Sequence, residues 1–114
     1  MKKIKSPASQ KLSTPPSSDF EVAVFAAELG TTTESLYLHG MNREDTGNEL
    51  DKFLNHQFML SAEVVKIIHG RGDQILRRTV EDYLKKCPFV EYFRGSNAPH
   101  EAGGATFAVI AKKD

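Results

Sequence analysis

The sequence predicts an α/β fold, an α+β two-layer sandwich with a four-stranded mixed sheet and two helices in the order βαβαββ. Short runs rich in β-branched and aromatic residues alternate with two longer segments whose hydrophobic residues recur at helical spacing. Turn residues such as Gly, Asn and Pro separate these segments. The 114 residues, 39% of them hydrophobic, can bury one modest core, so we expect a single folded domain.

The N-terminal third of the chain is expected to lie outside this domain. Residues 1–18 are rich in Lys, Ser and Pro, a composition that buries too little apolar surface to offset its ordering entropy, and they predict a disordered tail. The lysines of this tail are either an arm that contacts phosphates or a solubilising leader. Residues 19–34 form an N-terminal extension, in which alanines, a leading Asp and a closing Gly favour a short helix at the edge of the domain. The domain itself is expected over residues 35–114.

The first half of the domain predicts strand, helix and strand. Residues 35–38 are a β-prone run that stops at His39-Gly40. Asn42 is a suitable N-cap for a helix over about 43–60. Its buried stripe is expected to comprise Leu50, Phe53, Leu54 and Phe58. The β-branched run 64–68 predicts a central strand that is covered on at least one face.

The second half predicts a helix followed by two strands. Asp73 is a suitable N-cap for a helix over about 74–86, and Pro88 ends it. One face of this helix carries Leu76, Val80, Tyr83 and Leu84. Residues 90–94 and 106–110 predict two further strands, joined by the loop 95–104. The first two strands of the domain should be parallel, since a right-handed crossover joins them.

Composition excludes several classes of protein. Fifteen basic residues balance fifteen acidic ones, so net charge argues neither for nor against a polyanionic partner. Cys87 is the only cysteine, which rules out an intramolecular disulfide and zinc sites with two or more cysteines. No signal peptide and no run of 18 apolar residues is present. We expect a cytoplasmic protein with no membrane partner, a monomer, and no cofactor. A metal site is disfavoured because neither His56 nor His100 has a partner at ligand spacing.

Two polar clusters follow the first two strands, and parallel strands bring such turns to one edge of the sheet. His39 ends the first strand, and His69, Gly70, Arg71 and Gly72 follow the second. We therefore expect two imidazoles and one guanidinium to meet there. The glycines permit close approach of a ligand, the start of the following helix offers free N–H groups, and Arg71 suits a phosphate. These residues predict a nucleic-acid-binding site.

A structural interpretation stands beside this one. The segment 69–72 can be only a tight connection, in which His69 hydrogen-bonds a nearby carbonyl. Arg77 and Arg78 add positive charge to the next helix, and we count them as nucleic-acid-binding candidates. They can equally form a solvated helix face that Glu81 and Asp82 oppose.

These motifs together resemble the Smr (small MutS-related) domain, found at the C-terminus of bacterial MutS2 and as stand-alone proteins. The resemblance covers about residues 35–111 and depends on Leu36-Tyr37-Leu38-His39-Gly40, on His69-Gly70-Arg71-Gly72 and on Gly103-Gly104-Ala105-Thr106. It implies a fold similar to the C-terminal domain of a bacterial translation initiation factor. It also implies binding of DNA or RNA, with endonuclease (nicking) activity in many members, in DNA repair or in ribosome rescue.

Carried over by position, His39 is the histidine of the family's Asp-x-His motif and the candidate catalytic residue, and 69–72 is its glycine loop. Tyr37 departs from the pattern, because many nuclease-competent members have aspartate there and a phenol cannot replace a carboxylate as a metal ligand or as the anionic partner of His39. Any cleavage should therefore favour RNA and survive chelation. The alternatives are an inactive module that binds nucleic acid or the ribosome, and a protein-interaction domain.

Overall fold

The computed structural model describes residues 19–30, 33–72 and 74–113, and it has the predicted four-stranded mixed sheet. The elements follow one another as α2 (Asp19–Glu28), β1 (Glu34–Tyr37), α3 (Arg43–Met59), β2 (Val64–Ile68), α4 (Gln74–Lys86), β3 (Val90–Gly95) and β4 (Ala105–Ile110). The strand order across the sheet is β1-β2-β4-β3. β1 and β2 are parallel, as predicted, and the other two pairings are antiparallel.

The predicted boundaries agree with the structure to within one residue. β1 begins and ends one residue before the predicted strand, and α3 ends at Met59. The Asn42 side chain caps α3 by accepting a hydrogen bond from the backbone N–H of Asp45 at 2.8 Å. The expected disordered tail 1–18 and the Asp73 cap lie outside the described residues.

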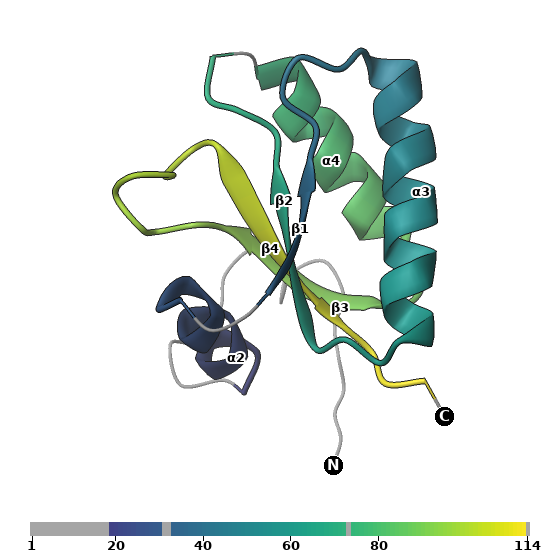
Figure 1. Ribbon diagram of the computed structural model, residues 1–114, viewed down its shortest axis with the longest axis vertical. Helices are drawn as coiled ribbons and strands as arrows, with labels where there is room; N and C mark the ends of the chain where they lie inside the picture. Colours follow the sequence, from purple (N-terminus) through teal and green to yellow (C-terminus); the bar gives the residue numbers. More distant parts are fainter. Residues whose placement is uncertain (1–18, 31–32, 73, 114) are drawn as a thin grey trace.

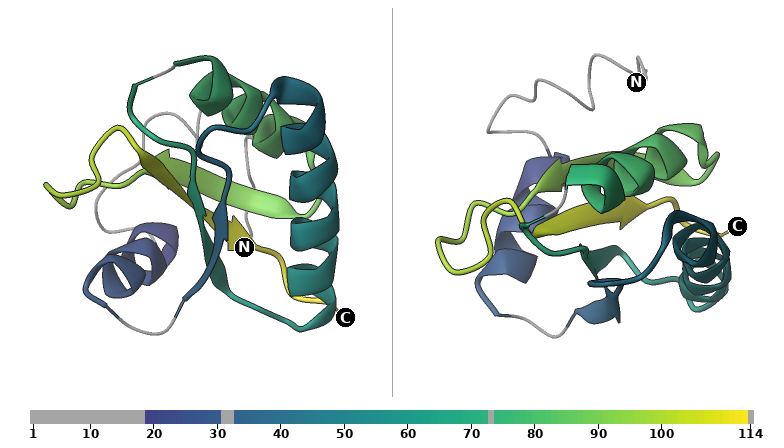
Figure 2. Two further views of the ribbon diagram at one scale, coloured as in Figure 1. Left: turned by 45° about the horizontal axis from the view of Figure 1, so that its top comes forward. Right: turned by 90° about the horizontal axis from the view of Figure 1, so that it is seen from above.

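Helices α3 and α4 cover one face of the sheet, as the views in Figures 1 and 2 show. Alternate residues of β2 point into this layer, where Val65 and Ile67 are fully buried. The buried side chains that α3 and α4 contribute are Leu50, Leu54, Val80 and Leu84. Full burial of one such side chain contributes about 1.5–3 kcal/mol, so this layer is the main core of the domain.

Helix α2 covers part of the opposite face rather than an edge of the domain (Figure 2). Its Val24 and Ala27 are buried against Phe107 and Val109 of β4. The ring of Phe20 stacks on Tyr92 of β3, with 5.6 Å between the ring centroids. The helix therefore adds a second, smaller core on the side that α3 and α4 leave open.

Ion pairs also hold α2 to the sheet. The Arg94 guanidinium donates to Glu21 at 2.7 Å and to Glu28 at 2.8 Å. Glu28 also accepts a hydrogen bond from the backbone N–H of Asn97 at 2.6 Å, and the Tyr92 hydroxyl donates to Glu21. The hydrogen bond from Arg94 holds the pKa of Glu28 below its ordinary value of 4.5, against the opposing effect of burial. These contacts join residues more than 60 positions apart and keep the N-terminal helix on the domain.

We predict that Glu28→Gln lowers the free energy of unfolding by about 1.5–3 kcal/mol at pH 7, the range expected for hydrogen bonds to charged groups. Because the pKa of Glu28 is lowered in the folded state, its contribution is present above pH 4.5 and disappears as the pH falls through that lowered value. Urea unfolding of both proteins at several pH values measures this difference. The control is Asp82→Asn, an exposed position on α4. An equal difference at pH 7 and well below pH 4 would contradict the assignment.

Candidate functional site

The register of β1 and β2 places His39 against Gly70. Tyr37 pairs with Ile68, and the N–H of Leu38 continues the ladder by donating to the carbonyl of Ile68 at 2.8 Å. His39 and Gly70 follow this pair by two residues on their respective strands. If Gly70 had a Cβ atom, that atom would lie 2.6 Å from Cδ2 of His39. The imidazole therefore lies directly on the bare Cα of Gly70. With φ at +90°, Gly70 also has a backbone conformation that residues with side chains rarely adopt.

Arg71 lies beside this contact and over the start of β4. A Cβ on Gly104 would lie 3.0 Å from Cγ of Arg71, so the arginine stem packs on a second bare backbone position. The carbonyl of Gly104 accepts hydrogen bonds from the N–H groups of both His69 and Gly70, each at 3.0 Å. His39 and Arg71 are exposed, and neither has an acidic partner within the described residues. We call His39, Gly70 and Arg71 the rim.

His69 does not join the rim, so the expectation that two exposed imidazoles meet there is wrong. Its side chain is only 2% exposed, because it continues the inward alternation of Val65 and Ile67. Nδ1 lies 3.1 Å from the carbonyl of Gly70 and Nε2 lies 3.0 Å from the hydroxyl of Thr106. The first contact requires Nδ1–H as donor, so Nε2 accepts from Thr106. Burial lowers the pKa of His69 below 6.5, which keeps the ring neutral, and its position fixes the turn from inside.

The other basic candidates differ in how much of their charge is free. Arg77 donates to Glu81 at 3.2 Å, which is the helix-face pairing that the structural interpretation anticipated. Arg78 is exposed in the second turn of α4 and has no ion pair among the described residues.

Gly72 is exposed, and a Cβ there would meet nothing within 4 Å. The first turn of α4 carries no acidic side chain, and Asp73, which directly precedes it, lies outside the described residues.

Comparison with known families now identifies the domain. The family model of the Smr domain matches residues 36–111. This chain belongs to the Smr domain family. The match includes the β1 turn with His39, the turn with Gly70 and Arg71, and the start of β4 with Gly104 and Thr106, so the resemblance seen in the sequence is confirmed.

Relatives of this Smr domain include much longer proteins. It is 40% identical over 81 residues to Endonuclease MutS2 of Staphylococcus epidermidis, covering 70% of this chain and 10% of that protein. It is 36% identical over 69 residues to Endonuclease MutS2 of Carboxydothermus hydrogenoformans, covering 60% and 9%. The chain thus spans about a tenth of the length of these relatives.

Solved structures confirm the fold. The Smr domain of Thermus thermophilus MutS2 superposes with a TM-score of 0.66 at 22% identity, covering 68% of this chain and 98% of that one. YdaL, a stand-alone small MutS-related protein from Escherichia coli, superposes with a TM-score of 0.67 at 23% identity, covering 72% and 67%. The expected mixed-sheet architecture is therefore that of Smr domains.

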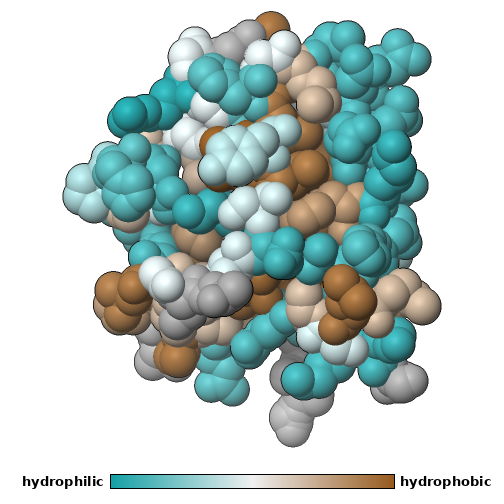
Figure 3. Space-filling model, viewed as in Figure 1, coloured by the Kyte–Doolittle hydropathy of each residue, from teal (hydrophilic) through white to brown (hydrophobic). Residues whose placement is uncertain are grey.

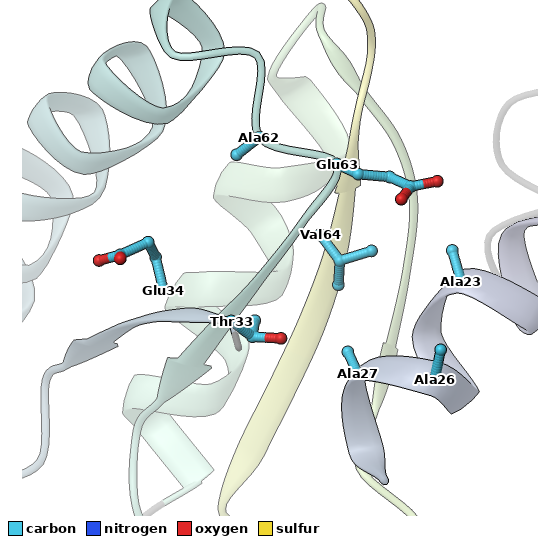
Figure 4. A pocket seen from close by; sticks show the side chains of 8 residues that line it. All are labelled: Ala23, Ala26, Ala27, Thr33, Glu34, Ala62, Glu63 and Val64. Carbon is cyan, nitrogen blue, oxygen red and sulfur yellow. The ribbon is translucent and has the colours of Figure 1, made fainter. Parts of the chain in front are cut away.

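A cleft lies at the opposite end of the sheet, between α2 and the beginnings of β1 and β2. Its volume is about 410 Å³, and Figure 4 shows Val64 pointing toward the alanines of α2 across it, while Glu34 points away. Its charged lining residues are Glu34 and Glu63, which suit a polyanion poorly. None of the residues predicted to bind nucleic acid lines this cleft.

No helix in the described part of the chain combines the length and the apolar character needed to cross a membrane. No three His, Cys, Asp or Glu side chains within the same residues are grouped so that they could hold a metal ion.

In the sequence, Gly104 and Thr106 stand out only as part of the resemblance to the Smr domain. The structure gives them roles, since Gly104 anchors the turn at its carbonyl and makes room for Arg71, and Thr106 holds the ring of His69. A Gly-Gly pair directly before a strand was the available signal for close backbone approach.

We predict that Gly70→Ala destabilises the domain by about 1–2 kcal/mol from backbone strain at positive φ, and that it displaces the His39 ring. Gly72→Ala is the matched control, because its Cβ meets open space and its φ is not positive. Thermal unfolding measures the first effect, and NMR shifts of the His39 ring protons measure the second. Equal effects of the two substitutions would show that the ring does not lie on Gly70.

Proposed function

We propose that this Smr domain binds nucleic acid at the rim and cleaves RNA there with His39. The observation that carries the proposal is the exposed imidazole lying on the bare backbone of Gly70 beside the exposed guanidinium of Arg71, which has no ion pair among the described residues. A guanidinium matches a phosphate with two parallel hydrogen bonds, and glycine lets the sugar-phosphate backbone approach closely. The name Endonuclease MutS2 of the relatives supports the same class of substrate.

Cleavage of RNA needs only the groups that the rim provides. His39 takes the proton of the 2′-hydroxyl, and the resulting oxygen attacks the neighbouring phosphorus. The bond to the 5′-oxygen breaks, and that oxygen takes a proton from the imidazolium. Arg71 and the N–H groups at the start of α4 stabilise the negative charge that develops on the phosphate. The products are a 2′,3′-cyclic phosphate and a 5′-hydroxyl.

Tyr37 favours this route over hydrolysis of DNA. Attack of water on a DNA phosphodiester needs a stronger activation of the nucleophile, for which a carboxylate at this position would serve as metal ligand or as partner of His39. A phenol supplies neither. The reaction proposed here depends on the 2′-hydroxyl of the substrate and proceeds with chelator present.

A second candidate function is binding without cleavage, either to free nucleic acid or to ribosomal RNA. Tyr37 favours this function too, because a phenol cannot serve as the anionic partner of His39 that a carboxylate at this position would provide. The experiment below separates the two functions.

We predict that His39→Ala abolishes cleavage of a single-stranded RNA and leaves its affinity within about twofold, since one uncharged contact is lost. Arg71→Ala should weaken binding by about tenfold and reduce the slope of log affinity against log salt by about one. Gel assays with EDTA present and fluorescence anisotropy at several salt concentrations measure these effects.

The controls are His56→Ala on the exposed face of α3 and Lys112→Ala beyond the end of β4. Neither should change cleavage or affinity. Binding without any cleavage by the wild-type protein would establish the second function. Cleavage of DNA that requires added divalent cation, or binding that is insensitive to Arg71→Ala, would contradict the proposed one.

A further inference from the structure

Tyr37 presents an exposed aromatic ring on the open part of the sheet. Its side chain is 70% exposed. Leu36 and Leu38 pack into the core beneath α3 and α4, so strand alternation turns Tyr37 to the opposite face. Helix α2 covers that face farther along, where it packs on Val64, Phe107 and neighbouring residues. A large exposed aromatic side chain at this place has no packing role in the described structure.

The neighbours of Tyr37 across the sheet are apolar. Tyr37 pairs with Ile68, and Ile68 pairs with Ala105 on the next strand. Ala105 is buried, so the surface consists of Tyr37 and the half-buried Ile68, which we call the platform. Figure 3 shows hydrophobic residues reaching the surface around β1 between hydrophilic surfaces.

Charge is neutralised next to the platform. In the adjoining row of the sheet, Lys66 forms an ion pair with Glu101 at 2.9 Å and lies over the ring of Phe107 at 5.5 Å. Both charges are therefore satisfied within the protein. The platform offers a ring and aliphatic surface without a free charge, which suits the face of a nucleobase and does not suit a phosphate.

The platform and the rim are one nucleotide apart. Tyr37 precedes His39 by two residues, which is about 6–7 Å along a strand. The same spacing separates Ile68 from Gly70 on the neighbouring strand. A phosphodiester held at the rim therefore places an adjacent base over the platform, provided that the base is free to turn outward.

We propose that Tyr37 stacks on an unpaired base next to the phosphodiester held at the rim, so that this Smr domain selects single-stranded nucleic acid over duplex. The proposal rests on the proposed function of the rim. In a duplex the base faces are stacked on one another and are not accessible to a ring on a sheet surface. Tyrosine instead of a carboxylate here also removes a negative charge that would repel the nucleic-acid backbone.

The test compares one short single-stranded 2′-O-methyl oligoribonucleotide with its own duplex, so that cleavage through a 2′-hydroxyl cannot interfere. The strand carries a fluorescein label for anisotropy and, in a second preparation, 2-aminopurine in place of one base. The variants are Tyr37→Ala, Tyr37→Phe and Arg71→Ala. Phe25→Ala is the matched control, because Phe25 is also an exposed aromatic residue, 56% exposed, but lies on α2 away from the rim.

We expect the wild-type protein to bind the single strand more tightly than the duplex and to quench 2-aminopurine fluorescence. Tyr37→Ala should weaken single-strand binding by about 5- to 100-fold, the range of one base–aromatic stack, with duplex binding unchanged. Tyr37→Phe should retain the affinity and the quenching, and Phe25→Ala should behave as wild type.

Three results would overturn the stacking proposal, and only one of them would also overturn the proposed function of the rim. If Arg71→Ala weakens binding of both forms and Tyr37→Ala weakens neither, the rim binds phosphate and the stacking proposal is wrong; a Tyr37 that serves a protein partner would give this result. If the wild-type protein binds neither form, both proposals are wrong. An equal loss on single strand and duplex in Tyr37→Ala would also overturn the stacking proposal.

Discussion

The parallel pairing of β1 with β2 is the constraint on which the rest of this structure depends. Leu38 is buried in the core and fixes the end of β1 against the layer of α3 and α4. The register that pairs Tyr37 with Ile68 then places His39 opposite Gly70. Because the two strands run in the same direction, both turns leave the sheet at one edge. A shift of one residue would exchange the faces of Leu38 and His39 and would dismantle both the core and the rim.

An inner layer of polar contacts supports the outer rim. The buried side chains of His69 and Thr106 form a hydrogen bond with each other. The carbonyl of Gly104 accepts hydrogen bonds from two backbone N–H groups of the turn. Buried polar groups that are fully paired rigidify a structure, whereas unpaired ones destabilise it. The backbone that carries Gly70 and Arg71 is therefore held in place before any ligand arrives. Such preorganisation is what the proposed phosphate site on these turns requires.

Local patterns in the sequence were sufficient for the helices and strands of the domain, since hydrophobic periodicity, the Asn42 cap and the glycine turns are all short-range signals. They favoured a short helix within residues 19–34 but did not predict the sheet face that α2 covers, because Arg94 and its partners Glu21 and Glu28 are more than 60 residues apart. The inward position of His69 could have been predicted, because it follows Val65 and Ile67 at intervals of two. Its partner Thr106 could not, since no local pattern relates residues 37 positions apart.

The central claim is that His39 and Arg71 hold one phosphodiester between them at the carboxyl ends of β1 and β2. The most direct measurement is an NMR titration of the 15N-labelled protein with a short 2′-O-methyl RNA, which binds and cannot be cleaved through its 2′-oxygen. We expect saturable shifts of the amides of His39, Gly70 and Arg71 and of the Arg71 guanidinium, with none around Glu63 at the far end of the sheet. Shifts confined to the cleft beside Glu63 and α2 would contradict it.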